Sequence, residues 1–123
     1  MRRYWITKYF HFSASHQYRD KVFGHNYVLG ITLGSLNEAD EEKLIKNIHT
    51  HLIDKVHSRD LGMGVDFLKG KEINDRTLLE SFAKIIEGVI PVSTLKSLTL
   101  KRDERTLAAL VFSSEFGEIS HGP

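Results

Sequence analysis

Two histidines, His16 and His25, stand at the ends of two consecutive apolar segments of the sequence. His16 ends the segment FHFSASH, and His25 opens the segment HNYVLGITLG. If these segments are antiparallel strands joined by a short connection, both histidines lie at the same end of one sheet. Neutral imidazole is a zinc ligand, and catalytic zinc sites usually combine three protein ligands with one open position. The pair therefore indicates part of a metal site or, alternatively, two structural histidines bonded to backbone groups.

The strands that would carry this pair are read from residue periodicity. Aromatic and β-branched residues at period two predict strands over residues 3–16 and 25–34, joined by the polar connection QYRDKVFG. Two further strands are predicted over residues 94–102 and 105–116, around a tight hairpin RDER, with a loosely ordered tail beyond.

Between the strand pairs, apolar residues recur at helical spacing. They predict amphipathic helices over residues 38–56 and 77–89, separated by a long loop over residues 57–75. Thr77 and Glu80 match the capping box that opens a helix.

The element order ββααββ predicts an α+β fold in a single domain over residues 1–123. Two hairpins and a helix pair favour a four-stranded antiparallel sheet with two helices on one face. The open edges of such a sheet must be covered, charged or paired. We therefore expect edge-to-edge pairing of subunits into an oligomeric barrel.

Composition narrows the class of protein. The 123 residues are 41% hydrophobic and 27% charged, with a net charge of +1 and no cysteine. The balanced charge gives no reason to expect nucleic-acid binding, and the lack of cysteine excludes disulfides and a cysteine nucleophile. No signal peptide is predicted at the N-terminus, and no run approaches the roughly 20 apolar residues of a membrane span. We expect a soluble, cytoplasmic protein.

The segments FSASH, residues 12–16, and GHNY, residues 24–27, resemble the 6-pyruvoyl-tetrahydropterin synthase family. This family includes the bacterial 6-carboxy-tetrahydropterin synthases of queuosine biosynthesis. Its pattern is F-x-A-A/S-H, a cysteine, and H-G-H-N-Y at the start of an apolar strand. The resemblance implies the tunnelling fold, a homo-oligomer such as a trimer or hexamer, and a reduced pterin as ligand. It also implies zinc-assisted phosphate elimination from a substrate of the dihydroneopterin triphosphate type, a carbon–oxygen lyase reaction.

The resemblance implies that His16 and His25 are zinc ligands. Phe23 stands where the family has its remaining histidine ligand, and phenylalanine has no lone pair to offer. His57 and His11 are the candidates for a replacement ligand, although His11 has the wrong strand parity.

Other site residues follow from the same resemblance. The position of the family's cysteine holds Arg19, which stays protonated and cannot act as a base. Asp20 and His57 are the alternative groups for moving protons. Glu104 corresponds to the glutamate that grips the pterin ring, since a carboxylate accepts two hydrogen bonds from adjacent N–H groups. Glu80 corresponds to the glutamate of the family's P-T-x-E stretch, which helps to hold the pterin.

Two hypotheses for function remain open. One is a zinc-dependent lyase acting on a reduced pterin triphosphate. The alternative is a catalytically degenerate relative that binds a pterin-like or purine-like heterocycle, or serves only as an oligomeric binding module. The family's segment L-D-H-R-x-L carries an aspartate–histidine pair, and in the similar segment VHSRDL, residues 56–61, His57 and Ser58 stand at those positions. This change and the replacements at Arg19 and Phe23 favour the second hypothesis.

Overall fold

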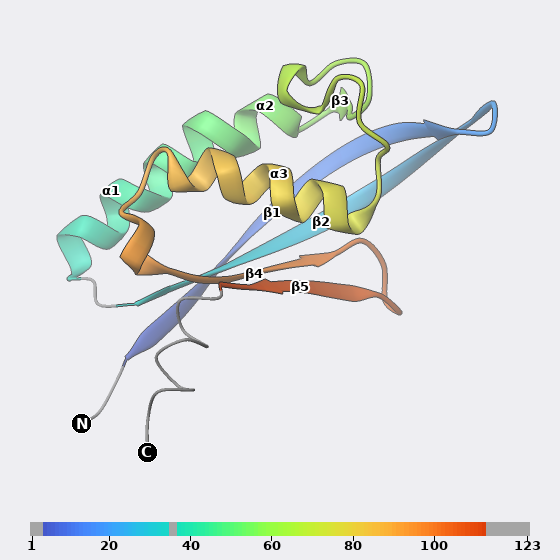
Figure 1. The fold of residues 1–123 in the computed structure, drawn as a ribbon. Helices are drawn as coiled ribbons and strands as arrows, with labels where there is room; N and C mark the ends of the chain where they lie inside the picture. The colour runs from blue at the N-terminus through green and yellow to red at the C-terminus, as the bar shows by residue number, and fades with distance from the viewer. Residues whose placement is uncertain (1–3, 35–36, 113–123) are drawn as a thin grey trace.

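The structure is a computed structural model that describes residues 4–34 and 37–112. One sheet carries the helices on one of its faces (Figure 1), and its strand order is β3-β1-β2-β4-β5. The strands are β1 (Trp5–Tyr18), β2 (Lys21–Gly34), β3 (Arg59–Asp60), β4 (Leu95–Lys101) and β5 (Leu107–Val111). The main helices are α1 (Glu38–Ile48), α2 (Asp54–Val56) and α3 (Asp75–Glu87). Within the described ranges, no helix has the length and apolar character needed to cross a membrane.

The first hairpin is longer than the sequence pattern predicts. Strands β1 and β2 pair from Trp5 opposite Gly34 to Tyr18 opposite Lys21. Only Arg19 and Asp20 form the turn, with φ angles of 50° and 65°. The prediction of a connection over residues 17–24 is therefore wrong. Figure 1 shows that this end of the hairpin extends beyond the layer of helices. Side chains there are not buried on one face, so the sequence need not alternate between apolar and polar residues.

The sheet has a fifth strand, so the prediction of a four-stranded antiparallel sheet is incomplete. Strand β3 is two residues long and runs parallel to β1 beside Ala14 and Ser15. It is held by backbone hydrogen bonds from the Ser58 amide to the Ser13 carbonyl at 2.6 Å and from the Leu61 amide to the Ser15 carbonyl at 2.7 Å. A strand this short has no detectable period, and only its tertiary partner identifies it.

The first predicted helix is confirmed in extent, but it is not uniform. Between α1 and α2 the chain continues through a π-helical turn, His49–Ile53. The turn keeps the adjacent residues Leu52 and Ile53 buried together with Ile48 and Val56. A wider turn brings neighbouring positions to the same side, which regular α-helical spacing does not allow.

The predicted capping box at the second helix is wrong. Helix α3 begins at Asp75, and its N-cap is Asn74, whose Oδ1 accepts a hydrogen bond from the Thr77 amide at 2.8 Å. Glu80 instead accepts a hydrogen bond from Arg76 Nε at 3.0 Å, one helical turn away. The asparagine cap moves the start of the helix two residues towards the N-terminus, and this places Asp75 in its first turn.

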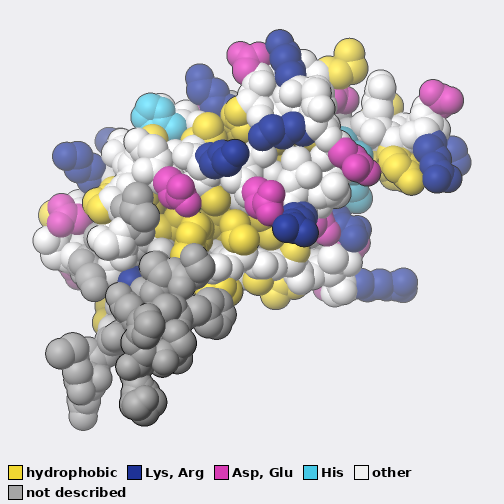
Figure 2. Space-filling model, in the orientation of Figure 1, with side chains coloured by type: hydrophobic (Ala, Val, Ile, Leu, Met, Phe, Trp, Pro, Cys, Tyr) yellow, Lys and Arg dark blue, Asp and Glu magenta, His cyan; other side chains and the backbone are white. Residues whose placement is uncertain are grey.

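The core lies between the sheet and the helices. Phe12 stacks on Tyr27 with ring centroids 4.9 Å apart, and Phe82 of α3 meets the Phe12 ring edge-on at 5.9 Å. Figure 2 shows that the surface on the helical side carries acidic and basic side chains interspersed among apolar ones. The core therefore anchors α3 over the middle of β1 and β2.

The last two strands are confirmed over their central residues, and they pair antiparallel from Ser97 opposite Val111 to Lys101 opposite Leu107. Residues 113–116 of the predicted final strand, the predicted tail and residue 3 of the predicted first strand lie outside the described residues.

Candidate functional site

His16 and His25 lie side by side on the face of the sheet that carries the helices. In the β1–β2 register, Ala14 is opposite His25 and His16 is opposite Phe23. Directly opposed residues share a face, as do residues two apart along one strand. The two imidazole rings stack with centroids 5.6 Å apart and an interplanar angle of 22°. The long hairpin thus brings together two histidines that are nine positions apart in the sequence.

These rings border a pocket of about 550 Å³ between the hairpin, the start of α3 and the end of β4. Its volume falls in the range of small-molecule sites. The wall is largely aromatic on the hairpin side and charged on the side of α3 and β4. The residues that define these two sides are His16, Phe23, His25, Tyr27, Asp75 and Arg102.

His16 has an unusual electrostatic environment. Its Nδ1 atom is buried and has no hydrogen-bond partner among the residues that the structure describes. The pKa of His16 is lowered from its ordinary value, mainly because burial penalises the charged imidazolium and also because His25 lies close by. A buried nitrogen without a partner is uncommon in proteins, which makes His16 a candidate for contact with a ligand or a water molecule.

Tyr27 lines the pocket with a buried side chain. Its side chain is only 2% exposed, and its ring meets the His25 ring edge-on at 5.5 Å. Burial raises the pKa of its phenol to about 12, with a smaller contribution from the negative charge of Asp75. The hydroxyl therefore stays protonated at physiological pH and can donate a hydrogen bond.

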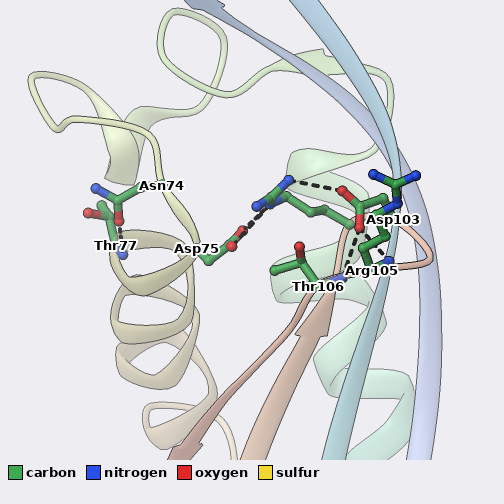
Figure 3. A network of polar contacts seen from close by, with 7 residues as sticks. Asn74, Asp75, Thr77, Asp103, Arg105 and Thr106 are labelled. Atoms are coloured by element: carbon green, nitrogen blue, oxygen red, sulfur yellow. Dashed lines mark hydrogen bonds and ion pairs between the residues drawn. The ribbon is translucent and has the colours of Figure 1, made fainter.

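The charged side of the pocket is a network around Arg102. Its Nε donates to both carboxylate oxygens of Asp75, at 3.2 and 3.1 Å, and its Nη1 donates to Asp103 Oδ2 at 3.0 Å. Figure 3 shows Asp75 and Asp103 on either side of this guanidinium, with Asp103 also accepting from the amides of Arg105 and Thr106 at 2.8 and 2.9 Å. The hydrogen bond to Asp75 raises the pKa of Arg102 further above its already high value. The network fixes one guanidinium between two carboxylates.

The residues near the histidine pair do not fit a three-ligand zinc site. Phe23 lies beside His16, with ring centroids 5.9 Å apart, and has no donor atom. Across residues 4–34 and 37–112, no group of three or more histidine, cysteine, aspartate or glutamate side chains is arranged to hold a metal ion. His11 points to the opposite face of β1, since it lies between the inward-facing Phe10 and Phe12. The pair alone supplies two ligands, fewer than catalytic zinc sites use.

The remaining predicted site residues do not line this pocket. Asp20 is exposed in the hairpin turn, Glu104 is exposed in the connection between β4 and β5, and Glu80 is exposed on α3. His57 accepts a hydrogen bond from the Ser13 amide at 3.0 Å, at the edge of β1. The structure therefore brings together His16 and His25, and separates them from the other four residues.

Sequence reasoning missed Asp75, Arg102 and Tyr27 as members of the pocket. A signal for Arg102 was present, because it continues the period-two series of Leu98 and Leu100 on the inner face. Asp75 could be recognised only once Asn74 was identified as the N-cap, since the capping box placed the helix start two residues later.

The fold is similar to that of known proteins. No protein-family profile matches the chain, and no curated protein matches its sequence. The fold is similar to that of 6-pyruvoyl tetrahydropterin synthase from Caenorhabditis elegans, with a TM-score of 0.78 and 20% identity over 92% of this chain and 98% of that chain. It is also similar to the crystal structure of 6-pyruvoyl tetrahydropterin synthase from Plasmodium vivax, with a TM-score of 0.54 and 13% identity over 89% and 98% of the two chains. At these identities the likeness establishes the fold, and the predicted tunnelling fold is confirmed.

Proposed function

We propose that this protein binds a reduced pterin, or a closely similar heterocycle, in the pocket beside His16 and His25. The fold shared with 6-pyruvoyl tetrahydropterin synthases supports this class of ligand. The observation that carries the proposal is His16, which lines a pocket of about 550 Å³ and whose buried Nδ1 lacks a partner among the described residues. A bound ring with a polar edge would satisfy that nitrogen.

The pocket has the chemistry expected of a site for a flat polar ring. The aromatic rings of Phe23 and His25 offer apolar contact area, and aromatic side chains stack readily on planar ligands. The hydroxyl of Tyr27, a lining residue, stays protonated and can act as a donor. Small-molecule sites are usually lined by apolar side chains with a small number of polar groups.

A second candidate function is zinc-assisted phosphate elimination from a dihydroneopterin triphosphate-type substrate. The observation in its favour is the pair of imidazoles on one face, 5.6 Å apart. In this reaction Asp20 or His57 would move protons, while Glu104 and Glu80 would contact the substrate. Because these residues do not line the described pocket, the lyase needs a neighbouring subunit to supply them. It also needs a further metal ligand from outside the described residues of one chain.

We further propose that the protein is a cytoplasmic homo-oligomer, a trimer or hexamer. The sheet face opposite the helices exposes large apolar side chains, and most of β1 is an open edge beyond the short β3. Open edges and exposed apolar surface both favour association with another chain. The exposed side chains on this face are Trp5, Tyr9, Leu107 and Val111. Light scattering of the purified protein tests the assembly, and a monomer at all concentrations would contradict it.

Ligand binding is tested by titrating the full protein with 7,8-dihydroneopterin and following the pterin fluorescence. We expect saturable binding at one ligand per subunit, weakened at least about tenfold in His16→Phe because the orphaned nitrogen is removed. His11→Phe is the matched control, since it lies on the opposite face of the same strand and should bind as the wild type does. Binding that is absent, or equal in the two variants, would contradict the proposal.

Metal analysis separates binding from catalysis. For the binding function we expect purified protein to hold zinc well below one ion per subunit and to release no phosphate from dihydroneopterin triphosphate. Near-stoichiometric zinc together with phosphate release would instead establish the lyase.

A further inference from the structure

The charges on the α3 side of the pocket are paired. Arg102 is the one arginine or lysine among the described residues that line the pocket. Its Nε faces the Asp75 carboxylate at 3.1 and 3.2 Å, and its Nη1 faces Asp103 at 3.0 Å. Two carboxylates thus surround one guanidinium. Of these groups only Asp75 and Arg102 line the pocket, so a ligand that reaches this side meets a carboxylate and a cation whose charge is already paired.

Asp75 has acceptor capacity left for a ligand. An ionised carboxylate offers about four lone-pair positions on its two oxygens. The single N–H of Arg102 Nε is shared between both oxygens of Asp75, and it therefore leaves several of these positions open. The Asp75 side chain is 22% exposed, so it is accessible from the pocket yet shielded from bulk water. Arg102 holds the carboxylate in a fixed orientation, which lowers the cost of ordering it when a ligand binds.

The glutamate that the sequence assigns to this task is elsewhere. Glu104 is exposed in the connection between β4 and β5 and does not line the pocket, whereas Asp75 does. Within the described part of the chain, Asp75 is the only carboxylate that lines the pocket.

We propose that Asp75 accepts hydrogen bonds from the N–H edge of the ligand ring, and that the pocket takes the unphosphorylated form of such an amino-heterocycle. This inference rests on the proposed binding function and narrows it to one class of ligand. A carboxylate pairs well with the adjacent N–H groups of a cyclic amidine or guanidine.

A phosphorylated ligand is disfavoured for the same reason. Phosphate near Asp75 meets a like charge, and the positive charge of Arg102 is already paired with Asp75 and Asp103. At the hairpin end, the guanidinium carbon of Arg19 lies 5.2 Å from the centre of the ring of Tyr18, which lines the pocket. Arg19 itself does not line the pocket.

The test compares two ligands on the full protein by isothermal titration calorimetry. We expect 7,8-dihydroneopterin to bind at least about tenfold more tightly than its triphosphate. We expect Asp75→Asn to weaken dihydroneopterin binding about tenfold or more, because a charged acceptor is lost. Glu104→Gln removes a carboxylate outside the pocket and should leave the affinity unchanged. Circular dichroism and urea denaturation verify that both variants are folded.

A triphosphate that binds as tightly as dihydroneopterin would overturn this inference and leave the binding function standing. The same conclusion would follow if folded Asp75→Asn kept the wild-type affinity or if Glu104→Gln lost it. If Asp75→Asn fails to fold, Asp75→Glu provides the second variant, since it keeps the charge and shifts the oxygens outward. It should weaken dihydroneopterin binding without reversing the preference between the two ligands, and a reversal would refute the assignment. Failure of both ligands to bind the wild type would instead refute the binding function itself.

Discussion

The imidazole of His57 accepts a hydrogen bond from the amide of Ser13, with 3.0 Å between the two nitrogens. This bond lies at the edge of β1, next to the point where the Ser58 amide bonds the Ser13 carbonyl. The amide of an edge strand has no ladder partner on its open side. The side chain of His57, in the segment that leads into β3, therefore supplies a hydrogen-bond partner for an amide at the edge of β1.

Replacing His57 with alanine should expose that amide. We expect faster hydrogen exchange at Ser13 and a loss of about 1 kcal/mol in the free energy of unfolding, the usual contribution of one hydrogen bond. Exchange is followed residue by residue by NMR, and binding of dihydroneopterin should be unchanged. Unaltered exchange at Ser13 would show that the hydrogen bond does not protect this amide. Loss of ligand binding would show that His57 contributes to the binding site.

The turn of the first hairpin offers a stabilising change. Arg19 and Asp20 both have positive φ, at 50° and 65°, and such two-residue hairpin turns favour Asn-Gly. The double replacement Arg19→Asn and Asp20→Gly should raise the free energy of unfolding by about 1 kcal/mol, because the left-handed conformation is unfavourable for ordinary side chains. Urea denaturation measures the change.

The same variant tests Asp20 as a base. If Asp20 moves protons in a lyase reaction, its removal should abolish phosphate release while the protein becomes more stable. If the turn is only structural, dihydroneopterin binding should be preserved. A drop in stability would contradict the assignment of the turn.

The pH dependence of stability should report His16. Its pKa in the folded protein is below the unfolded value of 6.5, mainly because of burial. As pH falls, the unfolded state binds the proton first, so stability is full above about pH 6.5 and is lost as pH falls through the folded pKa. Denaturation midpoints of chelator-treated wild type should therefore decline with acidity, and those of His16→Phe should decline less.

His11→Phe is the control for this measurement, since His11 is exposed on the other face of β1. It should retain the wild-type slope. Identical slopes for the wild type and His16→Phe would show that His16 does not contribute.

The aromatic contacts beneath the site should dominate the stability of the core. Phe82 is fully buried and meets the rings of Phe12 and Phe67 edge-on at 5.9 and 6.2 Å. Phe82→Ala should lower the free energy of unfolding by about 3–5 kcal/mol, the range for buried aromatic residues. Met63→Ala, at a side chain that is 69% exposed, should change it by less than about 0.5 kcal/mol. Similar losses in the two variants would contradict this view of the core.

Periodic burial made much of the fold predictable. Leu98 and Leu100 alternate with exposed or half-buried residues, and the apolar stripe of α3 repeats at helical spacing. These patterns arise because one face of each element packs against the core. Where that constraint is weak, prediction failed, as at the exposed end of the first hairpin and at β3.

The sequence by itself determined that His16 and His25 lie at the same end of one sheet, because a hairpin joins the two strands that carry them. Only the tertiary structure decided their neighbours. Asp75 comes from a helix start and Arg102 from the end of another strand, and no local period relates them. Glu104 stays outside the pocket although it is two residues from Arg102, because it lies exposed in the bend that follows β4. Local patterns fix which way a side chain points within its element, whereas the packing of elements fixes what it faces.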